Sequence, residues 1–295
     1  MSDSSSPELS RLGLDRRVPV AVLGATGTVG QRFITLLERH PWFEVAAVCA
    51  SERSAGRSYR EAAEWIQSEP LPQRVGDLTV IEASEAADSD ELAHCPLVFS
   101  ALDASVAEAI EAGFADAGHL VVSNARSHRM APDVPLLVPE VNPDHVELAR
   151  RRREAKGGAI VTNPNCSTIG LVLALAPLHR AFGVKQASVV TMQAVSGAGL
   201  PGISSYVMTD NVVPFIGGEE EKLEIEPHKI LGRLGDDGIE PAELTVSAQC
   251  NRVPVVDGHT LCVSLSLEQE ADADELRAAW REFRSEPQEL CLLYT

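Results

Sequence analysis

The chain contains 295 residues, 44% of them hydrophobic, which is enough for one large or two ordinary domains with full cores. Its formal net charge of −18, from 25 basic and 43 acidic residues, argues against nucleic acid or an anionic membrane surface as a partner. No apolar run approaches the roughly 20 residues of a membrane helix, and the N-terminus carries no apolar signal segment. We therefore expect a cytoplasmic protein whose residues 1–16 form a disordered tail.

The numbers and positions of cysteine and lysine residues further restrict the class of protein. The six cysteines form no CxxC pair, so we expect a reduced intracellular protein with no metal site. Cys49 and Cys262 lie in apolar strand patterns and are expected in the core. Lysine is scarce, and the acidic balance fits a halophilic composition as well as an ordinary acidic enzyme.

The first half of the chain begins with a βαβ pattern. Residues 18–25, "VPVAVLGA", form a short apolar run that ends near a glycine. Residues 28–40 follow with apolar side chains at helical spacing, among them Val29, Ile34 and Leu37, and residues 44–51 form the next apolar run. Strand, glycine turn, helix and strand within about 30 residues predict a parallel nucleotide-binding sheet.

Further strands are predicted at residues 78–83, 97–102 and 119–125, with a helix at 104–118 between the last two. This alternation predicts a Rossmann-like dinucleotide-binding domain over residues 17–164. The turn "GATGTVG" supplies glycines that let the backbone approach a pyrophosphate at a helix N-terminus.

The cofactor is expected to be NADP. After the second strand, "CASERSAGRSY" places hydroxyls and a guanidinium before any dominant carboxylate, which suits a 2′-phosphate better than free ribose hydroxyls. The expected cofactor-binding residues are Gly24, Thr26, Gly27, Thr28, Val29, Gly30, Ser51, Arg53, Ser54, Ser100, Ala101, Ser196 and Gly197.

The second half predicts a different domain, over residues 165–295, with catalytic and dimerisation roles. Residues 166–183 form a strongly apolar helix that begins at Cys166, and a helix N-terminus lowers the pKa of a thiol. Strand-like runs at 186–196, 242–255 and 260–268 predict an α+β domain with a mostly antiparallel sheet. A charged, helix-prone segment covers residues 217–232.

A dinucleotide domain followed by a helix headed by cysteine suggests a thiolate that attacks an acyl group, with hydride reducing the thioester. Such a site also needs an acid/base and cations for anionic groups. "NRVPVVDGHT" offers Arg252 and His259 for these two tasks.

Together these stretches resemble the aspartate-β-semialdehyde dehydrogenases, in particular their archaeal and fungal branch. The resemblance runs from about residue 17 to about residue 290. It rests on the order of "GATGTVGQRF", "ASERSAGRSY", "SNARSHRM", "PEVNP", "NPNCSTIG", "QAVSGAGLPG", "GGEEEK" and "NRVPVVDGHT".

The resemblance implies an NADP-dependent, phosphate-linked interconversion of L-aspartate 4-semialdehyde and 4-phospho-L-aspartate, in lysine, threonine and methionine biosynthesis. It also implies a homodimer or homotetramer. The roles that it implies are nucleophile for Cys166, acid/base for His259, acyl orientation for Gln193, α-carboxylate clamp for Arg252, amine ligand for Glu220, phosphate ligands for Lys222 and Arg129, and a place beside the nucleophile for Asn165. Glu219 and Glu221 are expected on a solvated helix face.

Two alternatives stay open. One is a malonyl- or succinyl-CoA reductase, which would share the chemistry but whose substrates lack an α-amino group. The other alternative is an inactive truncated remnant. Members of the family continue beyond the apolar end "CLLYT", so we expect a C-terminal return segment to be missing.

Overall fold

The computed structural model describes residues 15–199 and 201–285, and the predicted tail up to residue 14 and the end "CLLYT" lie outside them. The described residues form two compact units. The first contains those up to His128 together with Leu148–Thr162, and the second contains Arg129–Glu147 and those from Asn163 onward. Residues 129–147 thus cluster with the second unit although they precede the predicted boundary at residues 164 and 165.

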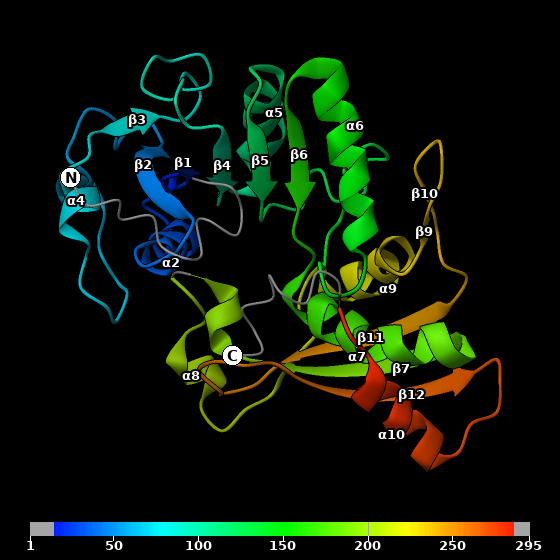
Figure 1. The fold of residues 1–295 in the computed structure, drawn as a ribbon. Coiled ribbons are helices and arrows are strands. Elements are labelled where there is room, and N and C mark those ends of the chain that lie inside the picture. Colours follow the sequence, from blue (N-terminus) through cyan, green and yellow to red (C-terminus); the bar gives the residue numbers. More distant parts are fainter. Residues whose placement is uncertain (1–14, 200, 286–295) are drawn as a thin grey trace. The chain divides into compact units, whose positions relative to one another are not determined.

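The first unit is built on a six-stranded sheet in the order β3-β2-β1-β4-β5-β6, with every pair parallel (Figure 1). Its elements are β1 (Val18–Leu23), α2 (Thr28–Leu37), β2 (Phe43–Ala50), α3 (Tyr59–Ala62), α4 (Gln73–Gly76), β3 (Val80–Glu82), β4 (Leu97–Ser100), α5 (Ala104–Asp116), β5 (Leu120–Ser123), α6 (Val146–Lys156) and β6 (Ala159–Thr162). This strand order is that of a Rossmann fold, so the predicted fold of the first half is confirmed.

The glycine turn after β1 lies where the strand order reverses. A Cβ on Gly24, whose φ is +67°, would meet the carbonyl oxygen of Ala101 after β4 at 2.6 Å. A Cβ on Gly30 in α2 would lie 2.2 Å from the carbonyl oxygen of Gly24. Glycine at both positions therefore allows the strand, the turn and the helix to pack closely. They do so at the point where the strand order reverses, which is where dinucleotides bind in this fold. Helix α2 buries Ile34 and Leu37 against the sheet, while Val29 is 42% exposed and lies outside the predicted core.

The second unit holds a four-stranded sheet in the order β12-β7-β11-β8. Its elements are η1 (Pro143–His145), α7 (Cys166–Phe182), β7 (Val184–Gln193), η2 (Val195–Ala198), α8 (Ser205–Met208), β8 (Val213–Pro214), α9 (Glu219–Ile230), β9 (Arg233–Leu234), β10 (Ile239–Glu240), β11 (Thr245–Arg252), β12 (Thr260–Leu267) and α10 (Ala273–Glu282). Helix α10 was not predicted.

The predicted mostly antiparallel sheet is not confirmed, because this sheet is mixed. β11 follows β7 after the helix α9, and such a helical crossover returns the chain in the same direction, so β7 and β11 pair in parallel. β12 follows a short turn and pairs antiparallel with β7. On one sheet face β7 and β11 bury alternate residues, among them Ala187, Val189, Val246 and Ala248, against Leu171, Leu175 and Leu223 of the helices.

The cysteines divide differently from the expectation. Cys49 is fully buried in β2, as predicted, whereas Cys262 in β12 is exposed. The alternation of β12 turns Cys262 to the outer face of the sheet, and an apolar strand pattern did not reveal that face. Within the described residues, no helix is long and apolar enough to span a membrane.

The close packing at Gly30 predicts a large cost for a single methyl group. Gly30→Ala should lower the free energy of unfolding by about 1–3 kcal/mol, because the methyl group would displace backbone. Gly113→Ala in α5 is the matched control: nothing lies within 4 Å of its Cβ, and alanine should stabilise the helix by up to about 1 kcal/mol. Urea denaturation of the two variants measures the contrast, and equal transition midpoints would contradict it.

Candidate active site

Cys166 is the first residue of α7, and Asn165 caps that helix. The side-chain oxygen of Asn165 accepts hydrogen bonds from the backbone N–H groups of Ser167 at 2.9 Å and Thr168 at 3.3 Å. The helix then buries its apolar side chains in the core of the second unit. Cys166 is therefore held at the fixed start of a helix whose apolar side is buried. The residue is partly exposed to solvent, while the surrounding protein desolvates its sulfur.

His259 approaches the thiol from the turn before β12. Its Nε2 lies 3.2 Å from the Cys166 Sγ, and its Nδ1 accepts the backbone N–H of Ala194 at 3.1 Å. Because Nδ1 accepts, the neutral ring carries its hydrogen on Nε2, facing the sulfur. Gly197 lies against this pair: an added Cβ would meet His259 Cε1 at 3.3 Å and an Arg252 nitrogen at 2.8 Å.

Parallel pairing brings Gln193 and Arg252 together. They are the last residues of β7 and β11, lie opposite each other in the register, and are both buried. The Arg252 Nη1 donates to the carbonyl oxygen of Ala194 at 2.7 Å, while its buried Nε has no hydrogen-bond partner among the described residues. A fixed guanidinium with an unused donor suits a planar anionic group such as a carboxylate.

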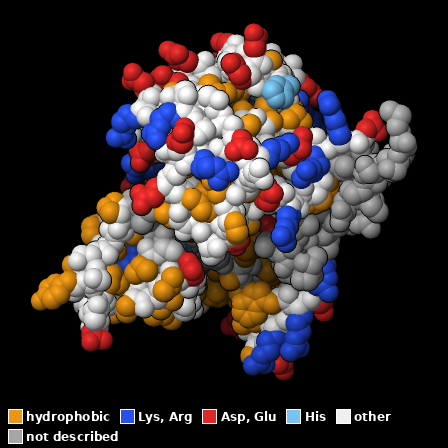
Figure 2. Space-filling view, turned by 90° about the vertical axis from the view of Figure 1, so that its left-hand side faces the viewer, with side chains coloured by type: hydrophobic (Ala, Val, Ile, Leu, Met, Phe, Trp, Pro, Cys, Tyr) orange, Lys and Arg blue, Asp and Glu red, His pale blue; other side chains and the backbone are white. Residues whose placement is uncertain are grey.

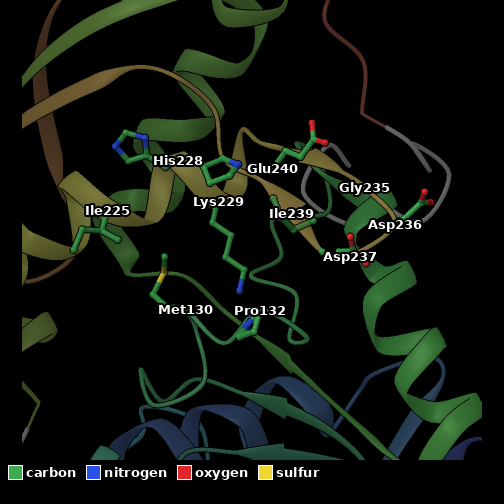
Figure 3. Close-up of a pocket in the computed structure, with 12 residues that line it drawn as sticks. Met130, Pro132, Ile225, His228, Lys229, Gly235, Asp236, Asp237, Ile239 and Glu240 are labelled. Carbon is green, nitrogen blue, oxygen red and sulfur yellow. The ribbon is translucent and has the colours of Figure 1, made fainter.

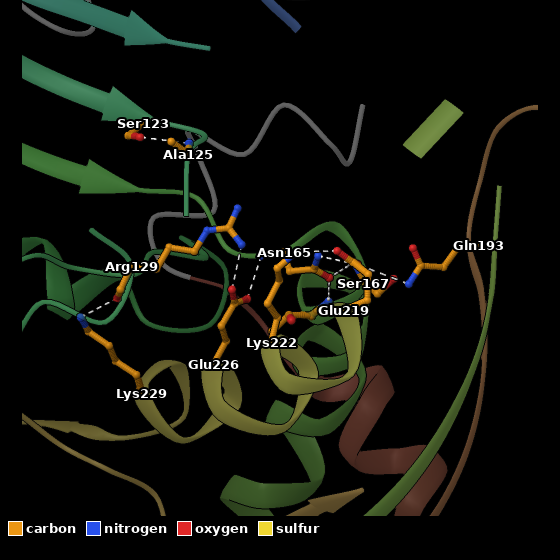
Figure 4. A network of polar contacts seen from close by, with 11 residues as sticks. Ser123, Ala125, Arg129, Asn165, Ser167, Gln193, Glu219, Lys222, Glu226 and Lys229 are labelled. Atoms are coloured by element: carbon orange, nitrogen blue, oxygen red, sulfur yellow. Dashed lines mark hydrogen bonds and ion pairs between the residues drawn. The ribbon is translucent and has the colours of Figure 1, made fainter. Parts of the chain in front are cut away.

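Glu219, at the start of α9, is the centre of the polar cluster (Figure 4). Its Oε1 accepts from the Lys222 ammonium at 2.6 Å, and its Oε2 accepts from the side-chain amide of Asn165 at 2.8 Å and from that of Gln193 at 3.4 Å. The expectation that Glu219 lies on a solvated helix face is wrong, because its position on α9 turns it toward the nucleophile's cap. Glu221 is exposed, as predicted.

Glu220 does not join this cluster. Its carboxylate accepts the backbone N–H of Cys250 on β11 at 3.0 Å. Adjacent helix positions point about 100° apart, so Glu219 turns toward Asn165 while Glu220 turns toward β11. The carboxylate that contacts Lys222 is that of Glu219, three positions before it, whereas Glu220, the expected amine ligand, contacts neither Lys222 nor Asn165 among the hydrogen bonds of the described residues.

A second buried carboxylate of α9 lies beside the same cap. Glu226 Oε1 is 2.8 Å from Nη1 of Arg129, and Glu226 Oε2 accepts the backbone N–H of Asn165 at 2.7 Å. Both side chains of the ion pair are buried. The structure thus joins the expected phosphate ligand Arg129 to the nucleophile's cap through a residue that we did not predict.

The electrostatics correct one expectation. Desolvation by the surrounding protein and the charge of Glu219 raise the pKa of Cys166 and outweigh the N–H groups at the helix start, which lower it. The predicted lowering of that pKa is therefore wrong. Desolvation and the charge of Arg252 lower the pKa of His259, which keeps its ring neutral. Burial alone would raise the pKa of Glu219, but the hydrogen bonds from Lys222 and Asn165 hold it below its usual value.

Most of the expected cofactor residues of the first unit lie in two places, the glycine turn before α2 and the turn after β2. Helix α2 starts at Thr28, and its N-cap residue Gly27 has no side chain that could cap the N–H groups of the first turn. Thr26 turns its carbonyl oxygen to the side chain of Gln31. After β2, Ser51 and Arg53 are exposed and Ser54 is half-buried in a turn. These features fit a dinucleotide whose pyrophosphate lies at the helix start.

Ser100 differs from the other expected cofactor residues. It is fully buried, and its hydroxyl donates to Glu111 Oε1 at 2.6 Å, as does Ser123 at 2.7 Å. The side chain of Ser100 therefore belongs to an internal network between β4, β5 and α5. Ala101, next along the chain, lies against Gly24. Ser196 and Gly197 are exposed in η2 of the second unit.

A pocket of about 740 Å³ at the other end of α9 lacks this chemistry (Figure 3). Met130, Pro132, Ile225 and the segment 235–241 line it. Lys229 points toward the segment that holds Pro132, and its ammonium donates to three backbone carbonyls. The pocket therefore offers neither a nucleophile nor an uncommitted cation among its lining residues.

Sequence reasoning missed Glu219 and Glu226. Helical spacing could have found both: Glu219, Lys222 and Glu226 recur at intervals of three and four on one face of α9, which also carries the buried Leu223 and Ile230. Charges on the apolar face of a helix are a signal of a buried polar site.

Family models match both halves of the chain. "Semialdehyde dehydrogenase, NAD binding domain" matches residues 19–149, and "Semialdehyde dehydrogenase, dimerisation domain" matches residues 175–293.

Individual proteins match at high identity. The aspartate-semialdehyde dehydrogenase of Methanothermobacter thermautotrophicus is 50% identical over 277 residues, which is 93% of this chain and 78% of that protein. The enzyme of the same name from Schizosaccharomyces pombe is 49% identical over 92% of this chain and 77% of its own. The crystal structure of aspartate semialdehyde dehydrogenase with NADP from Candida albicans covers 90% of this chain and 77% of its own, with 44% identity and a TM-score of 0.84. This chain belongs to the aspartate-semialdehyde dehydrogenase family.

Proposed function

We propose that this protein interconverts L-aspartate 4-semialdehyde and 4-phospho-L-aspartate, with NADP and inorganic phosphate, through a thioester on Cys166. The observation that carries the proposal is the cluster in the second unit: a thiol in contact with a histidine, a buried guanidinium, and a Glu–Lys pair on the nucleophile's cap. Membership of the family supports the same reaction.

In the oxidative direction, the Cys166 thiol releases its proton, and the thiolate adds to the aldehyde carbon to give a tetrahedral oxyanion. Loss of hydride gives the thioester, and a phosphate oxygen then attacks the acyl carbon and releases the sulfur. Because the pKa of Cys166 is raised in the free protein, the thiolate needs stabilisation. The Nε2–H of His259, 3.2 Å from the sulfur, can supply it and then donate to the oxygen of the tetrahedral intermediate.

The predicted acid/base role of His259 adds one requirement. To take a proton on Nε2 the ring must first place its hydrogen on Nδ1, which now accepts the N–H of Ala194. Proton transfer therefore requires that this bond opens during the cycle. Gln193 would orient the acyl group by its amide; its position beside Arg252 at the strand ends supports this role.

The remaining charges suit the rest of the substrate. Arg252 would clamp the α-carboxylate, since its Nε is unused. Glu219, rather than Glu220, would accept the substrate amine, and Lys222 with Arg129 would bind phosphate. A carboxylate between cations fits an amino acid better than a malonyl or succinyl thioester, which has no amine, and so disfavours the CoA-linked reductases.

NADP, when bound, supplies the acceptor for the hydride, and NADPH supplies the donor in the reverse direction. We assign the pyrophosphate to the turn from Gly24 to Gly30, where Cβ atoms do not fit, and the 2′-phosphate to Ser51, Arg53 and Ser54. The first unit, up to His128 and from Leu148 to Thr162, would form the cofactor domain, and the second unit, which includes residues 129–147, the catalytic domain.

The proposal includes a homodimer or homotetramer. On β7, β11 and β12, Ser188, Ser247 and Ser264 lie opposite one another in the register and are exposed, forming a sheet face of small side chains. Around α8, Tyr206, Val212 and Phe215 are exposed by 93%, 53% and 68%. Figure 2 shows hydrophobic side chains gathered in the lower part of its view, and acidic and basic ones interspersed. We propose these surfaces as the subunit interface. We also propose a cytoplasmic location, because catalysis needs Cys166 in its reduced form.

Replacing the nucleophile tests the function directly. Cys166→Ser should leave less than about a hundredth of the phosphate-dependent NADP reduction by aspartate semialdehyde, because a serine hydroxyl stays protonated and attacks poorly. Cys262→Ser, at another exposed thiol, is the control and should keep near-normal turnover. Absorbance of NADPH in high and low salt measures both. Comparable activity in the two variants would place the nucleophile elsewhere.

Glu219→Gln should change thiol reactivity and turnover in opposite directions. The Glu219 charge raises the pKa of Cys166, so its removal lowers that pKa and increases the thiolate fraction at any pH below it. Alkylation of Cys166 by iodoacetamide at neutral pH should become up to about tenfold faster, with the difference vanishing above both pKa values. Turnover should fall, because the substrate amine loses its carboxylate.

Glu220→Gln and the exposed Glu221→Gln are the comparison variants. Both should keep the alkylation rate and the Michaelis constant close to those of the unmodified protein. A larger loss of turnover in Glu220→Gln than in Glu219→Gln would restore the amine role to Glu220.

A further inference from the structure

The buried carboxylate of Glu226 has no role in the proposed reaction itself, yet it touches two parts of the site. One oxygen pairs with the Arg129 guanidinium at 2.8 Å, and the other accepts the backbone N–H of Asn165 at 2.7 Å (Figure 4). Glu226 and Arg129 are exposed by 3% and 8%. A buried carboxylate with both oxygens engaged fixes the geometry of whatever it binds.

Asn165 is the residue through which this contact reaches the nucleophile. Its side-chain oxygen caps the first turn of α7, which begins at Cys166. Glu226 holds its backbone N–H, while Glu219 holds its side-chain amide. Two carboxylates on the same face of α9, two turns apart, therefore set both the position and the rotation of the capping residue.

Arg129, the partner of Glu226, is also held at its backbone. The Lys229 ammonium donates to the carbonyl oxygens of Arg129 at 2.8 Å, Ala131 at 2.6 Å and Val134 at 2.7 Å. The same helix thus fixes the backbone of the segment 129–134 with Lys229 and the guanidinium of Arg129 with Glu226 (Figures 3 and 4). The orientation of Arg129 and that of the Asn165 cap depend on a single helix.

We propose that Glu226 is a positioning residue that couples the phosphate-binding arginine to the nucleophile's cap. The inference rests on the proposed function for the role of Arg129, but its effect on Cys166 needs no substrate. Glu226 does not touch the sulfur; it acts through Asn165. A neutral amide at this position would turn an NH2 group toward one of the two donors and would bind the other only through an uncharged oxygen, so one contact is lost and the remaining one is weakened.

The test compares Glu226→Gln with Glu224→Gln, a matched control on the same helix. The Glu224 carboxylate also accepts one backbone N–H, that of Ala248 at 3.1 Å, but outside this cluster. Two readouts are measured: the pH dependence of Cys166 alkylation by iodoacetamide, followed on its peptide by mass spectrometry, and the Michaelis constant for inorganic phosphate in NADP reduction.

In Glu226→Gln we expect the alkylation profile to move to higher pH, because a displaced cap weakens the N–H groups that favour the thiolate. The Michaelis constant for phosphate should rise and turnover should fall roughly ten- to a hundredfold. Glu224→Gln should move neither readout. A change in melting temperature alone, with both readouts unchanged in Glu226→Gln, would overturn the proposal.

The two proposals can fail separately. If the protein showed no phosphate-dependent NADP reduction, the proposed function would fail, whereas a shifted alkylation profile would still support Glu226 as a positioning residue. If Glu226→Gln does not fold, Glu226→Asp takes its place, since the shorter carboxylate cannot reach both partners. Its profile should shift in the same direction, and unmodified values would overturn the inference.

Discussion

Asn165 carries the hydrogen bonds on which the arrangement of the site depends. Its side-chain oxygen caps α7, its side-chain amide binds Glu219, and its backbone N–H binds Glu226. The helix that begins with the thiol and the helix that carries the charges are thereby joined at their starting turns. An asparagine can do this because it offers an acceptor and donors on one short side chain, whereas an aspartate would set a carboxylate against Glu219. The position of Cys166 and the charge around it are thus set by the same residue.

Parallel pairing of β7 and β11 supplies the other half of the site. The parallel register places Gln193 and Arg252 side by side at the strand ends. In an antiparallel pair, the end of one strand would lie beside the start of the other. The carbonyl and the N–H of Ala194 then fix Arg252 and His259 respectively. The ends of β7 and β11 and the starts of α7 and α9 are thus held close together with little freedom to move. A site that must hold a sulfur, an acyl group and two anions requires such a fixed arrangement.

Much of this could be predicted from local patterns. The strands of the first sheet follow from periodicity, and the glycine turn follows from the glycines at positions such as Gly24 and Gly30, where the structure excludes a Cβ. The family follows from the order of the motifs. What failed depended on three-dimensional direction. Three consecutive glutamates do not reveal which one faces the site until the phase of α9 is known, so the sequence alone does not distinguish Glu219 from a surface residue. The helix start alone predicts a lowered pKa for Cys166, because desolvation and the nearby Glu219 charge depend on the tertiary structure. Sheet direction and the outward face of Cys262 were missed for the same reason.

The central claim, a thioester on Cys166 released by phosphate, can be tested by trapping it. The protein is mixed with aspartate semialdehyde and NADP without phosphate, quenched in acid and digested, and the peptide that holds Cys166 is weighed. The account predicts a mass increase equal to one aspartyl group on that cysteine, which disappears when phosphate is added before the quench. An adduct on another residue, or NADPH formed without any modification of Cys166, would contradict it.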